Sequence, residues 1–256
     1  MRSKVICVAN EKGGVGKTTT SGALAAALKR RGYNVLAVDM DAQTNLSFSM
    51  GADLRLHATI YEVLKGEVKT QYAIQCTQVT DIIASSVLLS GLDLEFTGKG
   101  REFLLRNALA PVRELYDFVI IDAPPALGIL TVNSFTAADY VLIPMLSDIF
   151  SLQGIAQFYE TLERVRAMCN PDLKVAGIVL TKFNPRSRLS NEIRQTAERI
   201  AEDLHFPLLT TYIRNSVAIS EAQAAQRDII RYSPHCNAVW DYLKLADELL
   251  KGVLAQ

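Results

Sequence analysis

A short glycine-rich segment near the start of the chain constrains this protein more than any other feature. Residues 11–18 read Glu-Lys-Gly-Gly-Val-Gly-Lys-Thr and lie between an apolar run, Lys4–Ala9, and an alanine-rich stretch at 17–31. These flanks predict a buried strand that passes through a tight turn directly into a helix. In such a turn the backbone N–H groups point at an anion, and the helix N-terminus adds positive potential. The segment therefore predicts a phosphate-binding loop.

Two lysines in this segment have different expected roles. Lys17 is placed to reach the β- and γ-phosphates of a nucleotide, and the Thr18 hydroxyl is placed to bind Mg²⁺. The usual pattern G-x-x-x-x-G-K-[ST] is not met, because Glu11 stands at its first glycine and a second lysine, Lys12, follows. One nucleotide needs one such lysine, so Lys12 indicates a further role. We expect nucleotide contacts from the whole loop: Lys12, Gly13, Gly14, Val15, Gly16, Lys17, Thr18 and Thr19.

Apolar runs alternate with helical patterns along the chain. The predicted strands are Lys4–Ala9, Val35–Asp39, Thr80–Ala84, Phe118–Asp122, Tyr140–Pro144 and Val175–Thr181. The predicted helices lie at about 17–31, 59–65, 100–115, 151–169 and 189–204. Short Val/Ile-rich strands separated by helices indicate a doubly wound α/β fold, with a mostly parallel sheet covered by helices on both faces. We expect a single domain over residues 1–256.

Charge and cysteine content limit the function classes. Lys plus Arg and Asp plus Glu each total 27, so no net charge favours nucleic acid or a membrane, and any DNA contact needs a local patch. The four cysteines have no C-x-x-C spacing, and Cys7 lies inside an apolar strand, where we expect it to be buried. Scattered cysteines indicate a reducing compartment. No apolar run reaches membrane-spanning length, so we expect a cytoplasmic protein.

Acidic residues follow two of the predicted strands. Asp39 ends one strand, Asp41 lies two residues further, and Asp122 ends another. The carboxyl ends of parallel strands meet at the edge where phosphates bind. Phosphoryl transfer to water needs Mg²⁺, lysines and a polar group that positions the water. We expect Asp122 to contact Mg²⁺ through a water. For Asp39 a metal contact and a structural role, such as a helix cap, both stay open.

Three motifs together resemble the ParA/MinD (SIMIBI-class) ATPases. Residues 12–19 look like the family's deviant Walker A box. Residues 39–45 are similar to its D-x-D-P-Q-x-N segment, with Ala42 in place of the proline. Residues 118–125, FVIIDAPP, resemble its Walker B strand and switch segment. The resemblance extends from residue 4 to about 250 and is closest to the short chromosomal-type ParA (Soj-like) partition ATPases.

The resemblance implies roles for individual residues. Lys12 would reach the nucleotide of a second subunit in an ATP-dependent homodimer, and would act in catalysis with Lys17 and Asp41. Asp41 would position the attacking water. Asn215 lies in a stretch that matches the family's adenine-contacting segment. In that stretch the second arginine position, which the family uses to touch DNA, holds Ala218.

A basic turn offers another route to DNA. Arg186 and Arg188 follow the strand that ends near Lys182. If they share a face, they could bind the phosphates of double-stranded DNA without reading its sequence. A solvated loop is the other interpretation, and both stay open.

The resemblance implies an ATP-driven DNA-partition switch for a chromosome or plasmid. ATP and Mg²⁺ drive dimerisation, the dimer binds DNA nonspecifically on the nucleoid, and a ParB-like activator stimulates a weak basal hydrolysis. One alternative is a ParA-like ATPase that positions a non-chromosomal cargo or a protein complex. Others are MinD-like division-site positioning and a nucleotide-gated scaffold with negligible turnover. MinD-type relatives end in a basic amphipathic helix, whereas residues 237–256 carry two lysines against three acidic residues, so we expect no membrane contact.

Overall fold

The computed structural model describes residues 3–252 of the chain. Residues 253–256, which belong to the predicted C-terminal segment, lie outside the described part. So do the side chains of Asp93, Leu94, Ala156 and residues 149–154.

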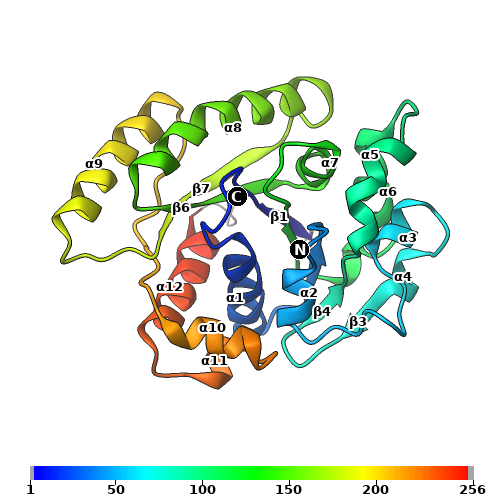
Figure 1. Cartoon of the computed structure of the whole chain (residues 1–256), viewed down its shortest axis with the longest axis horizontal. Coiled ribbons are helices and arrows are strands. Elements are labelled where there is room, and N and C mark those ends of the chain that lie inside the picture. The colour runs from blue at the N-terminus through cyan, green and yellow to red at the C-terminus, as the bar shows by residue number, and fades with distance from the viewer. Residues whose placement is uncertain (1–2, 253–256) are drawn as a thin grey trace.

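The core of the fold is a seven-stranded sheet with the order β3-β4-β2-β5-β1-β6-β7 (Figure 1). Every neighbouring pair is parallel except β3 and β4. The strands are β1 Lys4–Val8, β2 Val35–Asp39, β3 Ile74–Cys76, β4 Asp81–Ile83, β5 Phe118–Asp122, β6 Tyr140–Leu146 and β7 Lys174–Thr181. The predicted mostly parallel, doubly wound sheet is confirmed.

Helices cover both faces of the sheet. In Figure 1, α1 (Lys17–Arg30) and α12 (Asn237–Lys251) lie side by side below it, and α7 (Ile129–Ala137) and α8 (Ile149–Met168) lie above it. The remaining α-helices are α2 Asn45–Ser49, α3 Ile60–Leu64, α4 Thr70–Ala73, α5 Leu92–Glu95, α6 Leu104–Leu109, α9 Arg188–Asp203, α10 Val217–Ala224 and α11 Ile229–Tyr232. None of the described helices has both the length and the apolar character needed to cross a bilayer.

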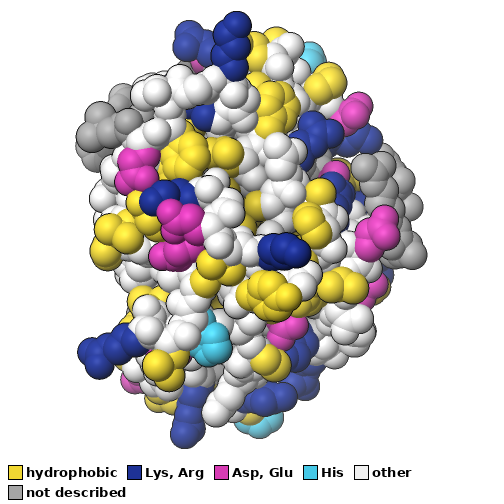
Figure 2. Space-filling view, turned by 90° about the vertical axis from the view of Figure 1, so that its right-hand side faces the viewer, with side chains coloured by type: hydrophobic (Ala, Val, Ile, Leu, Met, Phe, Trp, Pro, Cys, Tyr) yellow, Lys and Arg dark blue, Asp and Glu magenta, His cyan; other side chains and the backbone are white. Residues whose placement is uncertain are grey.

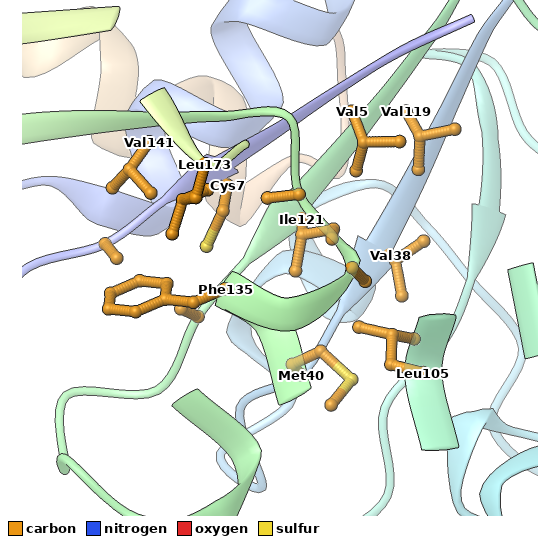
Figure 3. Close-up of a cluster of buried hydrophobic side chains, with 14 of the residues drawn as sticks. Val5, Cys7, Val38, Met40, Leu105, Val119, Ile121, Phe135, Val141 and Leu173 are labelled. Atoms are coloured by element: carbon orange, nitrogen blue, oxygen red, sulfur yellow. The ribbon is translucent and has the colours of Figure 1, made fainter. Parts of the chain in front are cut away.

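Side chains of the central strands alternate between two hydrophobic clusters, as the pleat of a strand requires. On β1, Val5 and Cys7 belong to one cluster, and Ile6 and Val8 belong to the other. Figure 3 shows the first cluster, where Phe135 of α7 lies beside the strand side chains. Cys7 is fully buried, as predicted. Burial on both faces makes the sheet a rigid support for the loops at its edges.

Among the differences from the predicted elements, two have a clear local reason. The predicted helix at 100–115 is broken into a 3₁₀ turn, the short helix α6 and a second 3₁₀ turn at Arg113–Leu115. Pro111 explains the break, because proline cannot continue a helix and restricts the residue before it. The edge strand β3 was not predicted, since three residues are too few to show a strand pattern.

Charged side chains of both signs lie close together on the face of the molecule that holds α3 to α6 (Figure 2). Such mixing agrees with the formal net charge of zero. A contact with nucleic acid therefore depends on a local set of cations elsewhere on the surface.

Candidate nucleotide-binding site

The predicted phosphate loop has the backbone of an anion site. Gly14 and Gly16 have φ angles of 76° and 90°, in the left-handed region where a side chain is strained. Gly16 directly precedes α1, and neither a capping side chain nor an acidic residue occupies the first turn of this helix. The first N–H groups of a helix have no partner within the helix. At α1 they are therefore available to an anion, with the helix dipole in support.

The loop forms one wall of a pocket of about 510 Å³. Of the predicted site residues, the lining contains Gly13, Gly14, Gly16, Lys17, Thr18, Thr19, Asp41 and Asn215. Val15 is fully buried, and its carbonyl accepts a 2.7 Å hydrogen bond from the Thr181 hydroxyl, so only its backbone can serve a ligand. Lys12, Asp39 and Asp122 are not part of the lining, and Arg186 and Arg188 lie away from the pocket, on the turn that leads into α9.

Lys17 lies at the base of this pocket, with only 7% of its surface exposed. Its ammonium group donates a 3.0 Å hydrogen bond to the backbone carbonyl of Lys12. Burial lowers the pKa of Lys17, and the negative charges of Asp122 and Asp41 oppose this shift. A buried ammonium held across the loop is well placed to bind phosphate.

Asp122 has the features of a group that contacts a hydrated cation. One carboxylate oxygen accepts a 2.8 Å hydrogen bond from Ser21 of α1. The other, Oδ2, is buried without a hydrogen-bond partner among the described residues. Burial is the largest cause that raises the pKa of Asp122, and the negative charge of Asp39 raises it further. The hydroxyls of Ser21 and Thr18 oppose this shift. An unpartnered carboxylate oxygen close to the Thr18 hydroxyl fits a Mg²⁺ ion, which prefers oxygen ligands and keeps bound waters.

Both carboxylate oxygens of Asp39 accept hydrogen bonds from residues nearby in the same chain. Its Oδ1 accepts from the Asp41 amide at 3.1 Å. Its Oδ2 accepts from the Ser47 amide at 2.8 Å and from the Ser47 hydroxyl at 2.7 Å. These bonds fix α2 against the end of β2, and they favour the structural role over the metal contact. The metal role of Asp39 stays a prediction.

Asp41 extends from the same strand end into the pocket. It is 9% exposed, and its Oδ1 accepts a 3.0 Å hydrogen bond from the Gln43 amide. Its carbonyl accepts from the Ser85 hydroxyl at 2.6 Å. Both bonds hold the carboxylate at the pocket wall, where a group that orients a water is required.

Lys12 forms an ion pair within its own chain. Its ammonium lies 2.7 and 2.9 Å from the two oxygens of Asp148, which follows β6. The Lys12 amide donates to the Asn10 side chain at 3.0 Å, and Asn10 donates to the carbonyl of Pro144 at 2.7 Å. The loop apex is thus tied to the end of β6. The predicted contact of Lys12 with a second subunit stays a prediction.

The predicted site residues did not include two charged residues at the carboxyl ends of the strands, Asp148 and Lys182. Lys182 follows β7, has a positive φ of 49°, lines the pocket and donates to the carbonyl of Gly14 at 3.2 Å. Both residues stand just after predicted strands. The rule that strand ends share an edge, applied to Asp39 and Asp122, would have found them as well.

Asn215 is held at the pocket by its neighbour Arg214. The Arg214 guanidinium binds Asp241 of α12 through two hydrogen bonds of 2.6 and 2.8 Å, and Asp241 is buried. This anchor fixes the 213–222 segment against the domain. Asn215 itself is exposed in the lining, where a base could contact it.

Comparison with known proteins agrees with this geometry. A family model described as an AAA domain matches residues 3–175. The chromosome partitioning protein ParA of Caulobacter vibrioides is 38% identical over 96% of this chain and 94% of that protein. The sporulation initiation inhibitor protein Soj of Bacillus subtilis is 35% identical over 96% of this chain and 98% of its own length. The chain belongs to the ParA/MinD family of ATPases, and within it to the Soj-like partition ATPases.

A solved structure extends the likeness of this ParA/MinD ATPase to three dimensions. Cobyrinic acid a,c-diamide synthase from Mycobacterium smegmatis, with bound ADP and magnesium, is 33% identical. It matches with a TM-score of 0.86 over 99% of this chain and 96% of that one. The doubly wound fold is thus shared well beyond the matched motifs.

Proposed function

We propose that this protein is an ATP-driven partition switch. It binds ATP with Mg²⁺, forms a dimer, binds double-stranded DNA without sequence preference and releases it when a ParB-like partner stimulates hydrolysis. The observation that carries the proposal is the second lysine, Lys12, at the apex of a phosphate loop whose own lysine, Lys17, already serves the pocket. Partition relatives at 35–38% identity over nearly the whole chain support the same assignment.

The residues present fit ATP and Mg²⁺, as in the solved relative with bound ADP and magnesium. The loop backbone and Lys17 would hold the phosphates, while Thr18 and Asp122 would hold the metal, Asp122 through a water. Mg²⁺ neutralises the charge that develops on the phosphates during transfer. Asp41 orients the attacking water, and Lys12 of a second subunit adds positive charge where negative charge develops.

The Lys12–Asp148 ion pair competes with this cross-subunit contact. Asp148→Asn removes the competitor, so we expect a tighter ATP-bound dimer. The pair is partly exposed, at 29% and 36% for the two side chains, and exposed pairs contribute up to ~1 kcal/mol. A symmetric dimer would break two such pairs, which gives up to ~2 kcal/mol, or about thirtyfold, in the dimer dissociation constant. Sedimentation velocity with ATP, in the non-hydrolysing Asp41→Ala background, measures the change. Glu192→Gln, which breaks the exposed pair with Arg188, is the control. A dimer no tighter than the parent's would contradict the competition.

DNA binding is assigned to the turn with Arg186 and Arg188. Arg188 is 94% exposed and is paired only at the surface, with Glu192 at 3.0 Å. Dimerisation would double the number of arginines offered to a phosphate backbone. The double substitution Arg186→Ala/Arg188→Ala should lower DNA affinity and leave basal ATP turnover unchanged. The slope of log affinity against log salt should fall by about one for each DNA phosphate that the variant no longer neutralises.

The control for this experiment is Arg194→Ala/Arg199→Ala, which removes the same amount of charge from within α9 and leaves the turn before this helix unchanged. Both pairs are compared by gel shift on ATP-bound dimers trapped with Asp41→Ala. If the Arg186/Arg188 variant binds DNA like the parent, the turn is a solvated loop. If the parent dimer itself ignores DNA, Ala218 is the decisive departure and positioning of another cargo becomes the better assignment.

The C-terminal helix argues against a MinD-like role at a membrane. Among the described residues of α12, Asp247 is paired with Arg31, just beyond the end of α1, at 2.6 Å. Leu243, Leu245 and Leu249 are buried against the domain. The apolar face of α12 is therefore used in packing, and its charges do not form the basic face that anionic lipids attract.

A further inference from the structure

A second polar pocket lies at the amino-terminal ends of the parallel strands, whereas the phosphate loop follows the carboxyl end of β1. It has a volume of about 300 Å³ and is lined by residues where β1, β6 and β7 begin, among them Lys4, Tyr140 and Lys174. The phosphate loop follows the carboxyl end of β1, so the length of the sheet separates the two pockets. Nothing in the proposed ATPase cycle uses this second pocket.

Buried polar atoms without a hydrogen-bond partner concentrate on residues that line this pocket. Among the described residues, four buried side-chain polar atoms have no hydrogen-bond partner. One is Asp122 Oδ2 at the nucleotide site, and the other three belong to Ser3, Arg113 and Thr136, which all line the second pocket. Ser3 is 3% exposed and Thr136 is 1% exposed. Each such atom costs about 1–3 kcal/mol if it stays unsatisfied, so three on residues of one pocket favour a partner there that accepts hydrogen bonds.

The surrounding contacts fix these groups in place. Arg113 donates through Nη2 to the Ser3 carbonyl at 2.9 Å and to the Asp139 carboxylate, while its buried Nε has no hydrogen-bond partner among the described residues. Asp139 also accepts from the Val5 amide at 2.7 Å. Asn170 donates to the carbonyls of Thr136 and Ala138 and so fixes the end of α7. The three unpartnered groups are a guanidinium N–H and two hydroxyls, and all can donate.

The charges of the residues that line the pocket indicate whether it favours a positively or a negatively charged ligand. Four cations line the pocket, Lys4, Arg106, Arg113 and Lys174, against two carboxylates, Asp139 and Asp172. Asp139 is already bound to Arg113 and to the Val5 amide. The lining therefore offers donors and excess positive charge, which match oxygen acceptors with negative charge. We infer that this pocket binds a small oxyanion ligand, carrying a phosphate or a carboxylate group, at a site separate from the nucleotide.

The test is calorimetric titration of pyrophosphate, and separately of citrate, into protein carrying Lys17→Ala, without Mg²⁺ or nucleotide. This background removes the phosphate-binding lysine of the first site, so failure of the ATPase assignment and failure of this pocket give different results. Binding of either anion supports the inference, and the anion that binds better identifies the phosphate or the carboxylate class. No binding of either up to about 10 mM would overturn it.

A matched pair of substitutions on α7 assigns the binding to this pocket. Thr136 and Thr131 are both 1% exposed, but only Thr131 has a partner, the carbonyl of Ala126 at 2.6 Å. Thr136→Val should weaken anion binding at least tenfold and leave the melting temperature equal or higher, because it removes an unsatisfied group. Thr131→Val should lower the melting temperature and leave anion binding unchanged. Equal anion binding in the Thr136→Val variant and its parent would contradict the inference.

Discussion

Replacing Lys17 by alanine should abolish ATP binding. The ammonium group is buried at the base of the pocket, between the loop carbonyl of Lys12 and the negative charges of Asp122 and Asp41. A charge-assisted hydrogen bond contributes ~1.5–3 kcal/mol, so loss of two such bonds to the phosphates weakens binding by about 10²–10⁴-fold. Isothermal titration of ATP with Mg²⁺ measures the effect.

The matched control is Lys29→Ala, at the exposed end of the same helix, α1. It should bind ATP like the parent. Lys17→Ala should still fold with a similar melting temperature, because removing a buried ammonium relieves a desolvation cost. If Lys17→Ala retained the parent's ATP affinity, the loop would not be the nucleotide site.

Asp41→Ala should separate ATP binding from ATP hydrolysis. The carboxylate lies in the pocket lining, and its two backbone-linked contacts hold it there without help from the phosphate loop. Loss of the group that orients the water should lower turnover by about 10²–10⁴-fold. ATP affinity and ATP-dependent dimer formation should stay close to those of the parent, since the loop and Lys17 are intact.

Steady-state phosphate release and titration calorimetry, done on the same preparation, measure the two quantities. Asp53→Ala removes a carboxylate from an exposed loop, where it accepts bonds from the Arg55 and Leu56 amides, and serves as the control. Turnover at the parent's rate in Asp41→Ala would remove Asp41 from catalysis. Loss of ATP binding would instead assign Asp41 to the structure of the pocket.

Long apolar strands were predictable from the sequence, and short elements were not. Phe118–Asp122 and Val35–Asp39 match their predicted bounds, because both are fully buried, follow a polar residue and end in an aspartate. β3 has three residues and only one buried side chain, so no periodic pattern marks it. α7 follows Gly128 and has buried side chains on most of its surface, so no polar face reveals its helical period.

The phosphate loop was predictable because its chemistry is local, whereas other parts of the site depend on long-range contacts. Gly14 and Gly16 need only their own backbone to form the turn. The Lys12–Asp148 pair joins residues 136 apart in sequence, and the Lys182–Gly14 bond joins residues 168 apart. Only the sheet order, with β1 between β5 and β6, brings Asp148 to the loop.

The most direct test of the partition switch is fluorescence anisotropy of a labelled duplex of random sequence, titrated with the wild-type protein in ATP and in ADP. A DNA-bound dimer that forms only with ATP predicts binding in ATP that weakens steeply with salt, and little binding in ADP. Equal affinity for the duplex in ATP and in ADP, or none in either, would contradict the account.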